Sequence, residues 1–176
     1  MTYKYIITQS LAMLMSLASN AFEVKSGQMV VVSADTARME PVAKTALKML
    51  KGDIRKVLGS EMKLVNTSVN SSIMQRDAAD FAYKKEAFLL KSANGCLYIK
   101  GSDDHGLAYG ILEVSRLLGV SPWKWWADAE PKQLKAFSLK EGYHNEQSPS
   151  VEYRGIFIND EDWGLMPWSG KTYEPS

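Results

Sequence analysis

The side chains best suited to chemistry lie near the end of the chain, in a run of four polar residues. An apolar stretch at residues 156–158 is followed at once by Asn159 and then by three consecutive acids. Near-continuous apolar runs are typical of buried parallel strands, and α/β enzymes place their reactive groups at the carboxyl ends of such strands. Asn159 and the following Trp163 are candidate substrate-binding residues. The candidate catalytic residues are Asp160, Glu161 and Asp162.

Glycoside hydrolysis is one reaction that uses carboxylates. It needs two carboxyl groups that flank the scissile bond, about 6.5–9.5 Å apart in inverting enzymes. Adjacent acids on one strand end do not span a substrate in this way, so a second carboxylate must come from elsewhere in the fold. The alternative is that the acids form a solvated turn, the usual environment of a charge run. The apolar strand before them, Trp163 and the directional amide of Asn159 favour a functional role.

A second aromatic cluster lies in the middle of the chain. Trp123, Trp125 and Trp126 fall within four residues of one another. Indole faces pack against sugar C–H groups, and the indole N–H donates to hydroxyls. The same side chains could instead cover an apolar edge of the domain. Both interpretations stay open.

A glycine-bearing segment at residues 101–106 has the position of a phosphate-binding loop but not the spacing of one. The two acids after Ser102 would also repel a phosphate. We therefore expect a structural role, in which Ser102 or Asp103 caps a helix. Gly106 and Gly110 would allow that helix to pack closely on the sheet.

Composition describes a globular chain and excludes some partners. Hydrophobic residues make up 45% and charged residues 23%, and 21 basic residues oppose 20 acidic ones. This balance gives no electrostatic reason to expect nucleic acid or an anionic membrane as a partner. Two histidines and one cysteine give no metal-ligand spacing, so we expect no metal and no cofactor. Cys96 lies in an apolar run and is expected to be a buried small hydrophobe.

The first 21 residues resemble an export signal. Lys4 provides the positive charge, residues 11–17 the apolar core, and small residues precede a cleavage point after Ala21. The apolar core is too short to span a bilayer. We expect an exported protein, periplasmic or extracellular.

Periodicity predicts an α/β fold class: a small layered domain with a mixed β-sheet and two main helices. One helix follows Asp35 or Thr36 as its cap, has Pro41 in its first turn and ends at Gly59; the other covers residues 104–118. Residues 66–80 are predicted to be loop. Strands are expected at residues 28–33, 62–67, 86–91, 96–100 and 136–139.

The expected domain boundaries follow from these elements and from a polar stretch near the end. We expect a signal peptide at residues 1–21, an α/β domain at 22–132 and a linker at 133–150. Residues 151–176 would begin a second domain, whose first strand is 153–158.

Distinctive motifs occur at residues 84–90, 101–103, 108–116, 119–128 and 153–163. Together these motifs resemble glycoside hydrolase family 115, whose members are xylan α-1,2-glucuronidases that act with inversion. The resemblance implies an N-terminal domain like the one that precedes hexosaminidase barrels, followed by the start of a truncated (β/α)8 barrel. It also implies that Asn159 to Trp163 line a uronic acid pocket, over which Trp125 and Trp126 close.

Two functions follow from these observations. The first is the N-terminal part of an exported enzyme that removes glucuronic or 4-O-methylglucuronic acid from xylan, inactive as this fragment alone because a barrel needs about 250 residues. Its partners would be the side groups of glucuronoxylan or xylo-oligosaccharides, and the full-length parent could be a homo-oligomer. The second is a stand-alone, non-catalytic carbohydrate-binding or assembly module. In the first case, residues 153–158 are expected to lack neighbouring strands and to leave apolar side chains exposed.

Overall fold

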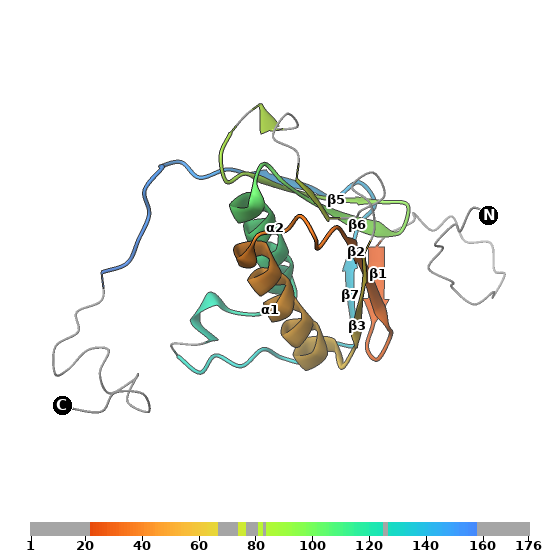
Figure 1. Cartoon of the computed structure of the whole chain (residues 1–176). Helices are drawn as coiled ribbons and strands as arrows, with labels where there is room; N and C mark the ends of the chain where they lie inside the picture. Colours follow the sequence, from red (N-terminus) through yellow and green to blue (C-terminus); the bar gives the residue numbers. More distant parts are fainter. Residues whose placement is uncertain (1–21, 67–73, 77–80, 83, 125–126, 158–176) are drawn as a thin grey trace, which may run out of the picture.

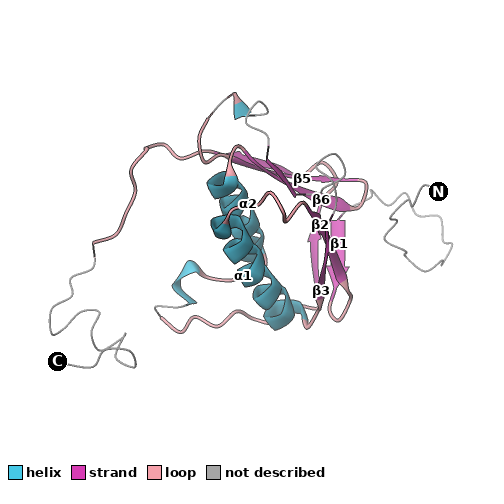
Figure 2. Ribbon diagram, viewed as in Figure 1, coloured by secondary structure: helices cyan, strands magenta, loops and turns pink. Residues whose placement is uncertain are grey.

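The computed structural model describes residues 22–66, 74–76, 81–82, 84–124 and 127–157. Two helices lie side by side against one face of a β-sheet, and a short two-stranded ribbon stands beside that sheet (Figures 1 and 2). The expected export signal lies outside the described residues. In chain order the elements are β1 (Phe22–Lys25), β2 (Val30–Ala34), α1 (Pro41–Leu58), β3 (Met62–Asn66), β4 (Met74–Arg76), β5 (Phe88–Ala93), β6 (Cys96–Gly101), α2 (Asp104–Leu117), the short 3-10 helix η3 (Pro122–Lys124), β7 (Ala136–Leu139) and β8 (His144–Gln147).

The main sheet is mixed, which confirms the expected small α/β domain with two helices. Its strand order is β3-β2-β4-β6-β5-β8. β2 runs parallel to β3 and β4, and β4 runs parallel to β6, whereas β5 is antiparallel to both β6 and β8. β5 and β6 are joined through Asn94 and Gly95, whose φ angles of 54° and 71° are those that an Asn-Gly hairpin turn requires. β1 and β7 form the separate antiparallel ribbon.

Proline and glycine set the two ends of α1. Pro41 occupies the first turn, where its missing N–H is not needed, and Glu40 is the N-cap residue without a side-chain capping bond. The prediction that Asp35 or Thr36 caps this helix is wrong. Both residues lie in the turn before it, where the Thr36 N–H donates to Asn66 Oδ1 at 3.2 Å. Gly59, at φ 61°, ends the helix as predicted.

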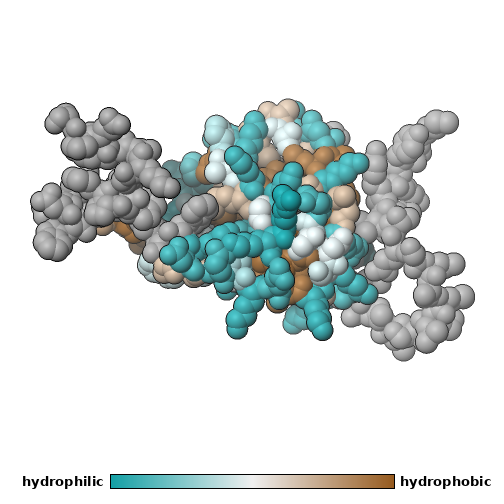
Figure 3. Space-filling model, turned by 90° about the horizontal axis from the view of Figure 1, so that it is seen from below, coloured by the Kyte–Doolittle hydropathy of each residue, from teal (hydrophilic) through white to brown (hydrophobic). Residues whose placement is uncertain are grey.

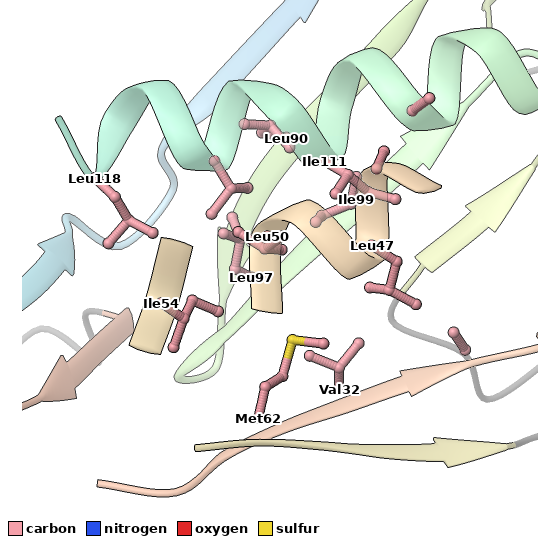
Figure 4. Close-up of a cluster of buried hydrophobic side chains, with 14 of the residues drawn as sticks. Val32, Leu47, Leu50, Ile54, Met62, Leu90, Leu97, Ile99, Ile111 and Leu118 are labelled. Atoms are coloured by element: carbon pink, nitrogen blue, oxygen red, sulfur yellow. The ribbon is translucent and has the colours of Figure 1, made fainter. Parts of the chain in front are cut away.

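The core lies between the two helices and the sheet, and Figure 4 shows its apolar side chains pointing toward one another from both layers. Leu90 of β5 and Ile111 of α2 are completely buried. Full burial of one such side chain stabilises the fold by about 1.5–3 kcal/mol. Gly110 allows α2 to lie close to β5 and β6, because a Cβ at this position would lie 3.0 Å from Ile99 Cγ2 and 3.2 Å from Phe88 Cβ.

The surface around this core is largely polar. Lys44, Lys48, Lys51 and Arg55 of α1 are all exposed. Hydrophilic side chains cover much of the face seen from below, with smaller hydrophobic patches among them (Figure 3). Within the described residues, no helix combines the length and apolar character that a membrane crossing requires.

Three strands were not expected, and each depends on a distant partner. β4 lies inside the predicted loop 66–80, where its three residues join β2 to β6. β1 exists through its pairing with β7. β8 falls in the predicted linker 133–150, and together with β7 it shows that residues up to Gln147 belong to the domain rather than to a linker. The polar composition of β8 misled the prediction, because an edge strand can be polar and still pair along its length.

Candidate functional site

The predicted catalytic acids and most of their predicted companions lie outside the described residues. This applies to Trp125 and Trp126 and to all of residues 159–163. Their proximity to one another therefore stays a prediction. The structure does describe the residues that lead to the acids, 151–157, which we call the exit segment, and the part of the domain that this segment contacts.

The exit segment is extended but unpaired. Residues 153–157 form no strand, contrary to the expectation for 153–158, because no described strand lies beside them to complete a ladder. Tyr153 is 88% exposed, Ile156 77% and Phe157 92%. The exposure itself agrees with the expectation that these apolar side chains lack neighbours. The segment therefore presents hydrophobic groups that the domain does not cover.

Arg154 ties the exit segment to the domain. Its Nη2 donates to the Glu86 carboxylate and, at 3.3 Å, to the Tyr109 hydroxyl. Its guanidinium carbon lies 5.9 Å from the centre of the Tyr109 ring, within the range of a cation–π contact. Nη1 donates to the carbonyl of Val151 at 2.7 Å and to that of Glu152 at 3.3 Å. We call Arg154, Glu86 and Tyr109 the arginine clamp.

Arginine is always charged in proteins, and the partners of the clamp arginine favour the charged form further. The hydrogen bond that Arg154 donates to Glu86, followed by the one that it donates to Tyr109, raises the pKa of Arg154 above its already high ordinary value. A second ion pair across the same contact joins Lys85 Nζ to Glu152 at 3.7 Å, with both side chains mostly exposed. Exposed pairs of this kind contribute little stability. Arg154, with its several partners, is therefore the main polar attachment described for the exit segment.

A rigid corner of the domain positions Glu86. We call this corner, residues 84–87 and 101–106, the strand-to-helix junction. The Glu86 N–H donates to Asp103 Oδ2 at 2.7 Å, while Asp103 Oδ1 accepts from the N–H of Gly106 at 2.7 Å and so caps α2. The Ala87 N–H donates to Ser102 Oγ at 2.9 Å. One carboxylate thus both caps the helix and orients the residue that holds Arg154.

The junction confirms a structural role for residues 101–106. Asp103 is the N-cap, as predicted. A Cβ on Gly106 would lie 2.1 Å from the carbonyl oxygen of Ala87, so only glycine fits there. The Glu40 N–H donates to Asp104 Oδ1 at 2.9 Å, which connects the start of α1 to the same corner. These contacts use the acids of the segment for packing rather than for binding a phosphate.

The loop that carries the tryptophan cluster, residues 121–128, is described except for residues 125–126. Trp123 lies on η3 and is 64% exposed. The loop is fastened to α1 by an ion pair at 2.7 Å between Lys124 Nζ and Asp53 Oδ1, two side chains that are mostly buried. An exposed indole beside a fixed loop suits either of the two predicted roles, sugar contact or the covering of a neighbouring surface.

The arginine clamp was missed by the sequence reasoning. Glu86, Tyr109 and Arg154 all fall inside segments that carry the family resemblance. Glu86 and Arg154 are 68 residues apart, and Tyr109 and Arg154 are 45 apart, so no local pattern connects them. Among the described residues, no group of His, Cys, Asp or Glu side chains is arranged to hold a metal ion.

Comparison with known proteins shows which family this chain resembles. The profile of glycosyl hydrolase family 115 matches residues 146–176, which include the exit segment and the acidic run. A solved family GH115 4-O-methyl-α-glucuronidase, BtGH115A, described as specific for decorated arabinogalactans, is 45% identical, with a TM-score of 0.75 over 88% of this chain. This chain spans 22% of the length of that protein.

A second solved structure, a GH138 enzyme targeting pectin rhamnogalacturonan II, is 19% identical and covers 63% of this chain and 15% of its own, with a TM-score of 0.38. That likeness is too weak to carry an argument. No curated protein matches the chain. The identity and coverage of the GH115 structure, together with the profile match over the acidic run, show that the chain belongs to glycoside hydrolase family 115.

Proposed function

We propose that this chain is part of an exported glycoside hydrolase that removes glucuronic or 4-O-methylglucuronic acid from a glycan. The observation that carries the proposal is the 45% identity, over 88% of this chain, to a 4-O-methyl-α-glucuronidase. Export is supported by the signal pattern in residues 1–21, with cleavage after Ala21. The reaction requires no cofactor, because two carboxyl groups and a water molecule are sufficient.

In this proposal the acidic run forms one wall of the uronic acid pocket. Asp160, Glu161 and Asp162 are the candidates for a catalytic or water-orienting carboxylate, and Asn159 and Trp163 contact the sugar. Trp125 and Trp126 close over the pocket. An inverting enzyme holds its two carboxyl groups about 6.5–9.5 Å apart on opposite sides of the bond, so the other carboxyl group comes from a (β/α)8 barrel that follows the exit segment. The chain as given would then be inactive.

The proposed substrate is a uronic acid side group, and an experiment decides which polymer carries it. The resemblance to the family favours xylan, whereas the solved relative is described as specific for decorated arabinogalactans. In this proposal the released sugar is the same uronic acid in both cases, and only the backbone that carries it differs. Release of uronic acid from 4-O-methylglucuronoxylan and from uronic acid-decorated arabinogalactan, measured side by side with the full-length polypeptide, distinguishes them.

The test of the site uses single carboxylate-to-amide variants of the full-length polypeptide. Asp160→Asn, Glu161→Gln and Asp162→Asn are compared with Glu141→Gln, an exposed acid on the turn before β8. Loss of a general acid or base lowers kcat about 10²–10⁴-fold, and we expect at least one of the first three to show such a loss while Glu141→Gln keeps full activity. Full activity in all three would remove the acidic run from the mechanism.

The second candidate, a non-catalytic sugar-binding or assembly module, is favoured by one observation, the 64% exposure of Trp123. Titration of the chain with xylo-oligosaccharides, followed by tryptophan fluorescence, tests it. Saturable binding that Trp123→Ala abolishes, combined with no uronidase activity in any longer form of the polypeptide, would favour the module over the enzyme.

A further inference from the structure

One side of α1 carries a row of positive charge that none of the functions above uses. Lys44, Lys48, Lys51 and Arg55 recur at intervals of three or four residues, and we call these four residues the basic stripe. Because each residue of a helix turns it by about 100°, the four side chains fall within about 60° of one another on the helix surface. Lys44 and Arg55 are 11 residues apart, since 55 minus 44 is 11, so the stripe is about 16 Å long.

The charge of the stripe is not offset by acids on the same helix. Asp53 is the carboxylate of α1, and it is buried and paired with Lys124. The solvent side of α1 is therefore strongly basic, although the chain as a whole is nearly neutral. Its exposed residues include five cations and no acid: Pro41, Lys44, Thr45, Lys48, Met49, Lys51, Gly52, Arg55 and Lys56.

Three members of the stripe also lack partners of opposite charge. Among the residues that the structure describes, no ion pair includes Lys44, Lys48 or Lys51. Arg55, at the other end, lies 3.4 Å from the exposed carboxylate of Glu61. An ammonium group is a compact, hydrated point charge on a flexible stem. These three lysines can therefore contact an incoming anion without breaking an existing pair.

The stripe weakens the helix that carries it. Lys44 and Lys48 are like charges four residues apart, and so are Lys51 and Arg55, and such pairs repel one another on a helix. Lys44 also lies in the first turn of α1, where the helix dipole favours acids, and that turn contains no acid. Local helix stability therefore does not explain the row. A ligand that carries repeated negative charge would explain it, because it would relieve the repulsion.

The substrate of the proposed function is such a ligand. A glycan with uronic acid side groups presents carboxylates at several points along its length, whereas a released uronic acid presents one. Proteins that bind single-stranded nucleic acid usually combine a basic groove with aromatic side chains for base stacking, and α1 contains no aromatic residue. The row of charge without a stacking surface therefore favours an acidic glycan over a nucleic acid.

We propose that the basic stripe of α1 is a surface subsite for the carboxylates of an acidic glycan, in addition to the proposed uronic acid pocket. Contact along about 16 Å of helix holds a polymer with several carboxylates and does not hold a single released sugar. The proposal rests on the proposed function, because the identity of the anion comes from the proposed substrate.

A binding experiment with this chain compares two forms of one polymer. 4-O-Methylglucuronoxylan and the same polymer after chemical reduction of its carboxyl groups differ in charge. At low salt we expect the acidic form to bind about tenfold more tightly, and this difference should disappear in about 1 M NaCl, where charges are screened within a few ångströms. Equal affinity for the two forms would overturn the proposal. Equally tight binding of duplex DNA at the same salt concentration would indicate a general polyanion surface and would also overturn it.

Two double variants of equal charge show which lysines take part. Lys44→Gln with Lys51→Gln removes two charges from the stripe, whereas Lys91→Gln with Lys140→Gln removes two exposed charges from β5 and from the residue after β7. We expect the first pair to weaken binding of the acidic polymer about tenfold and the second to leave it unchanged. Retained affinity in the first pair, or an equal loss in both, would overturn the proposal.

The exposed indole of Trp123 provides a further control. Trp123→Ala should bind the acidic polymer as the wild type does, because the contact at the stripe is electrostatic and needs no aromatic surface. Loss of binding in this variant, with binding retained in Lys44→Gln with Lys51→Gln, would place the polymer on the loop of residues 121–128 and overturn the proposal.

Kinetics of the full-length polypeptide separate this proposal from the proposed function. In Lys44→Gln with Lys51→Gln we expect the KM for glucuronoxylan to rise about tenfold with kcat unchanged, and both constants for a short uronic acid-bearing oligosaccharide to stay the same. An active enzyme whose KM for the polymer does not change keeps the function and loses the subsite. A wild-type polypeptide that releases no uronic acid, although this chain binds the acidic polymer through the stripe, loses the function and keeps the subsite.

Discussion

The strand-to-helix junction and the exit segment meet at Arg154, but they are held in opposite ways. In the junction, the N–H groups of Glu86 and Ala87 are satisfied by Asp103 and Ser102, and Gly106 packs directly on the neighbouring backbone. In the exit segment, Arg154 and Glu152 carry the polar side-chain contacts described with the domain. Apolar side chains of the exit segment remain exposed.

This difference separates a self-sufficient scaffold from a part that needs a partner. The junction obtains its stability from contacts made within residues 84–106, together with one from Glu40. The exit segment leads directly to the acidic run, the region that the family profile matches. Stability is not uniform across a protein, and functional segments are often drawn from its less stable regions. Here the family-specific residues follow a segment that, among the described residues, is attached to the domain mainly through Arg154.

The largest expected effect comes from disturbing the junction. Gly106→Ala places a Cβ 2.1 Å from the Ala87 carbonyl oxygen, a backbone atom that cannot move aside. Overpacking destabilises by about 1–3 kcal/mol and occasionally by more, and we expect this variant at the upper end, measured as a shift of the urea midpoint or as loss of folded protein. The control is Gly52→Ala in this chain, where the new Cβ meets nothing within 4 Å and stability should rise by up to about 1 kcal/mol. Equal effects of the two variants would contradict the close packing.

The cap of α2 should give the next largest effect. Asp103→Ala removes the acceptor for Gly106 and for Glu86, so the free energy of unfolding should fall by about 1–2 kcal/mol. Asp103→Asn keeps a capping oxygen and should lose less. Chemical denaturation followed by circular dichroism measures both. If the alanine variant is as stable as the wild type, the shared carboxylate does not organise this corner.

Removing the clamp should affect the exit segment while leaving the domain stable. For Arg154→Ala we expect a change of no more than about 0.5 kcal/mol in global unfolding, together with faster hydrogen exchange in residues 151–157. Lys85→Ala removes an exposed ion pair and should change neither quantity. A global loss of several kcal/mol in Arg154→Ala would show that the two regions are one cooperative unit.

The smallest expected effect on stability concerns Cys96, the first residue of β6, next to the turn of the β5–β6 hairpin. Partial burial raises the pKa of its thiol above the value in the unfolded chain. A raised pKa means that the folded state holds this proton more tightly. The stability from this group is therefore complete below the unfolded pKa of about 8.5 and is lost as pH rises through the folded value. The unfolding free energy of the wild type should decline slightly more between pH 7 and pH 10 than that of Cys96→Ala; parallel profiles would contradict this.

Raising the pH should not release the clamp by deprotonating its arginine. The pKa of Arg154 is raised, chiefly by Glu86, so its pairing would be lost only as pH rises through a value beyond the ordinary range for arginine. The hydrogen exchange rates of residues 151–157, corrected for their intrinsic pH dependence, should stay level between pH 6 and pH 9. A loss of protection within that interval would show that a group other than Arg154 controls the attachment.

Local patterns predicted the elements whose stability is local. The Asn94-Gly95 turn, the Asp103 cap and the glycine contacts of α2 were all expected from neighbouring residues, and the structure confirms them. Pro41 also indicated the first turn of α1, although the cap was assigned several residues too early. The predicted role of the acidic run in the site stays a prediction, because those residues lie outside the described part of the chain.

By itself the sequence determined the α/β class, the two helices with their buried faces, and the family to which the acidic run belongs. These features depend on periodicity, caps and motifs that lie within a few residues of one another. The tertiary structure was needed for β4, for β8 and for the arginine clamp. Each of these joins residues far apart in the chain. Contacts of this kind form only when the whole domain has folded. They produce no local sequence pattern, because the residues that make them are not neighbours in the chain.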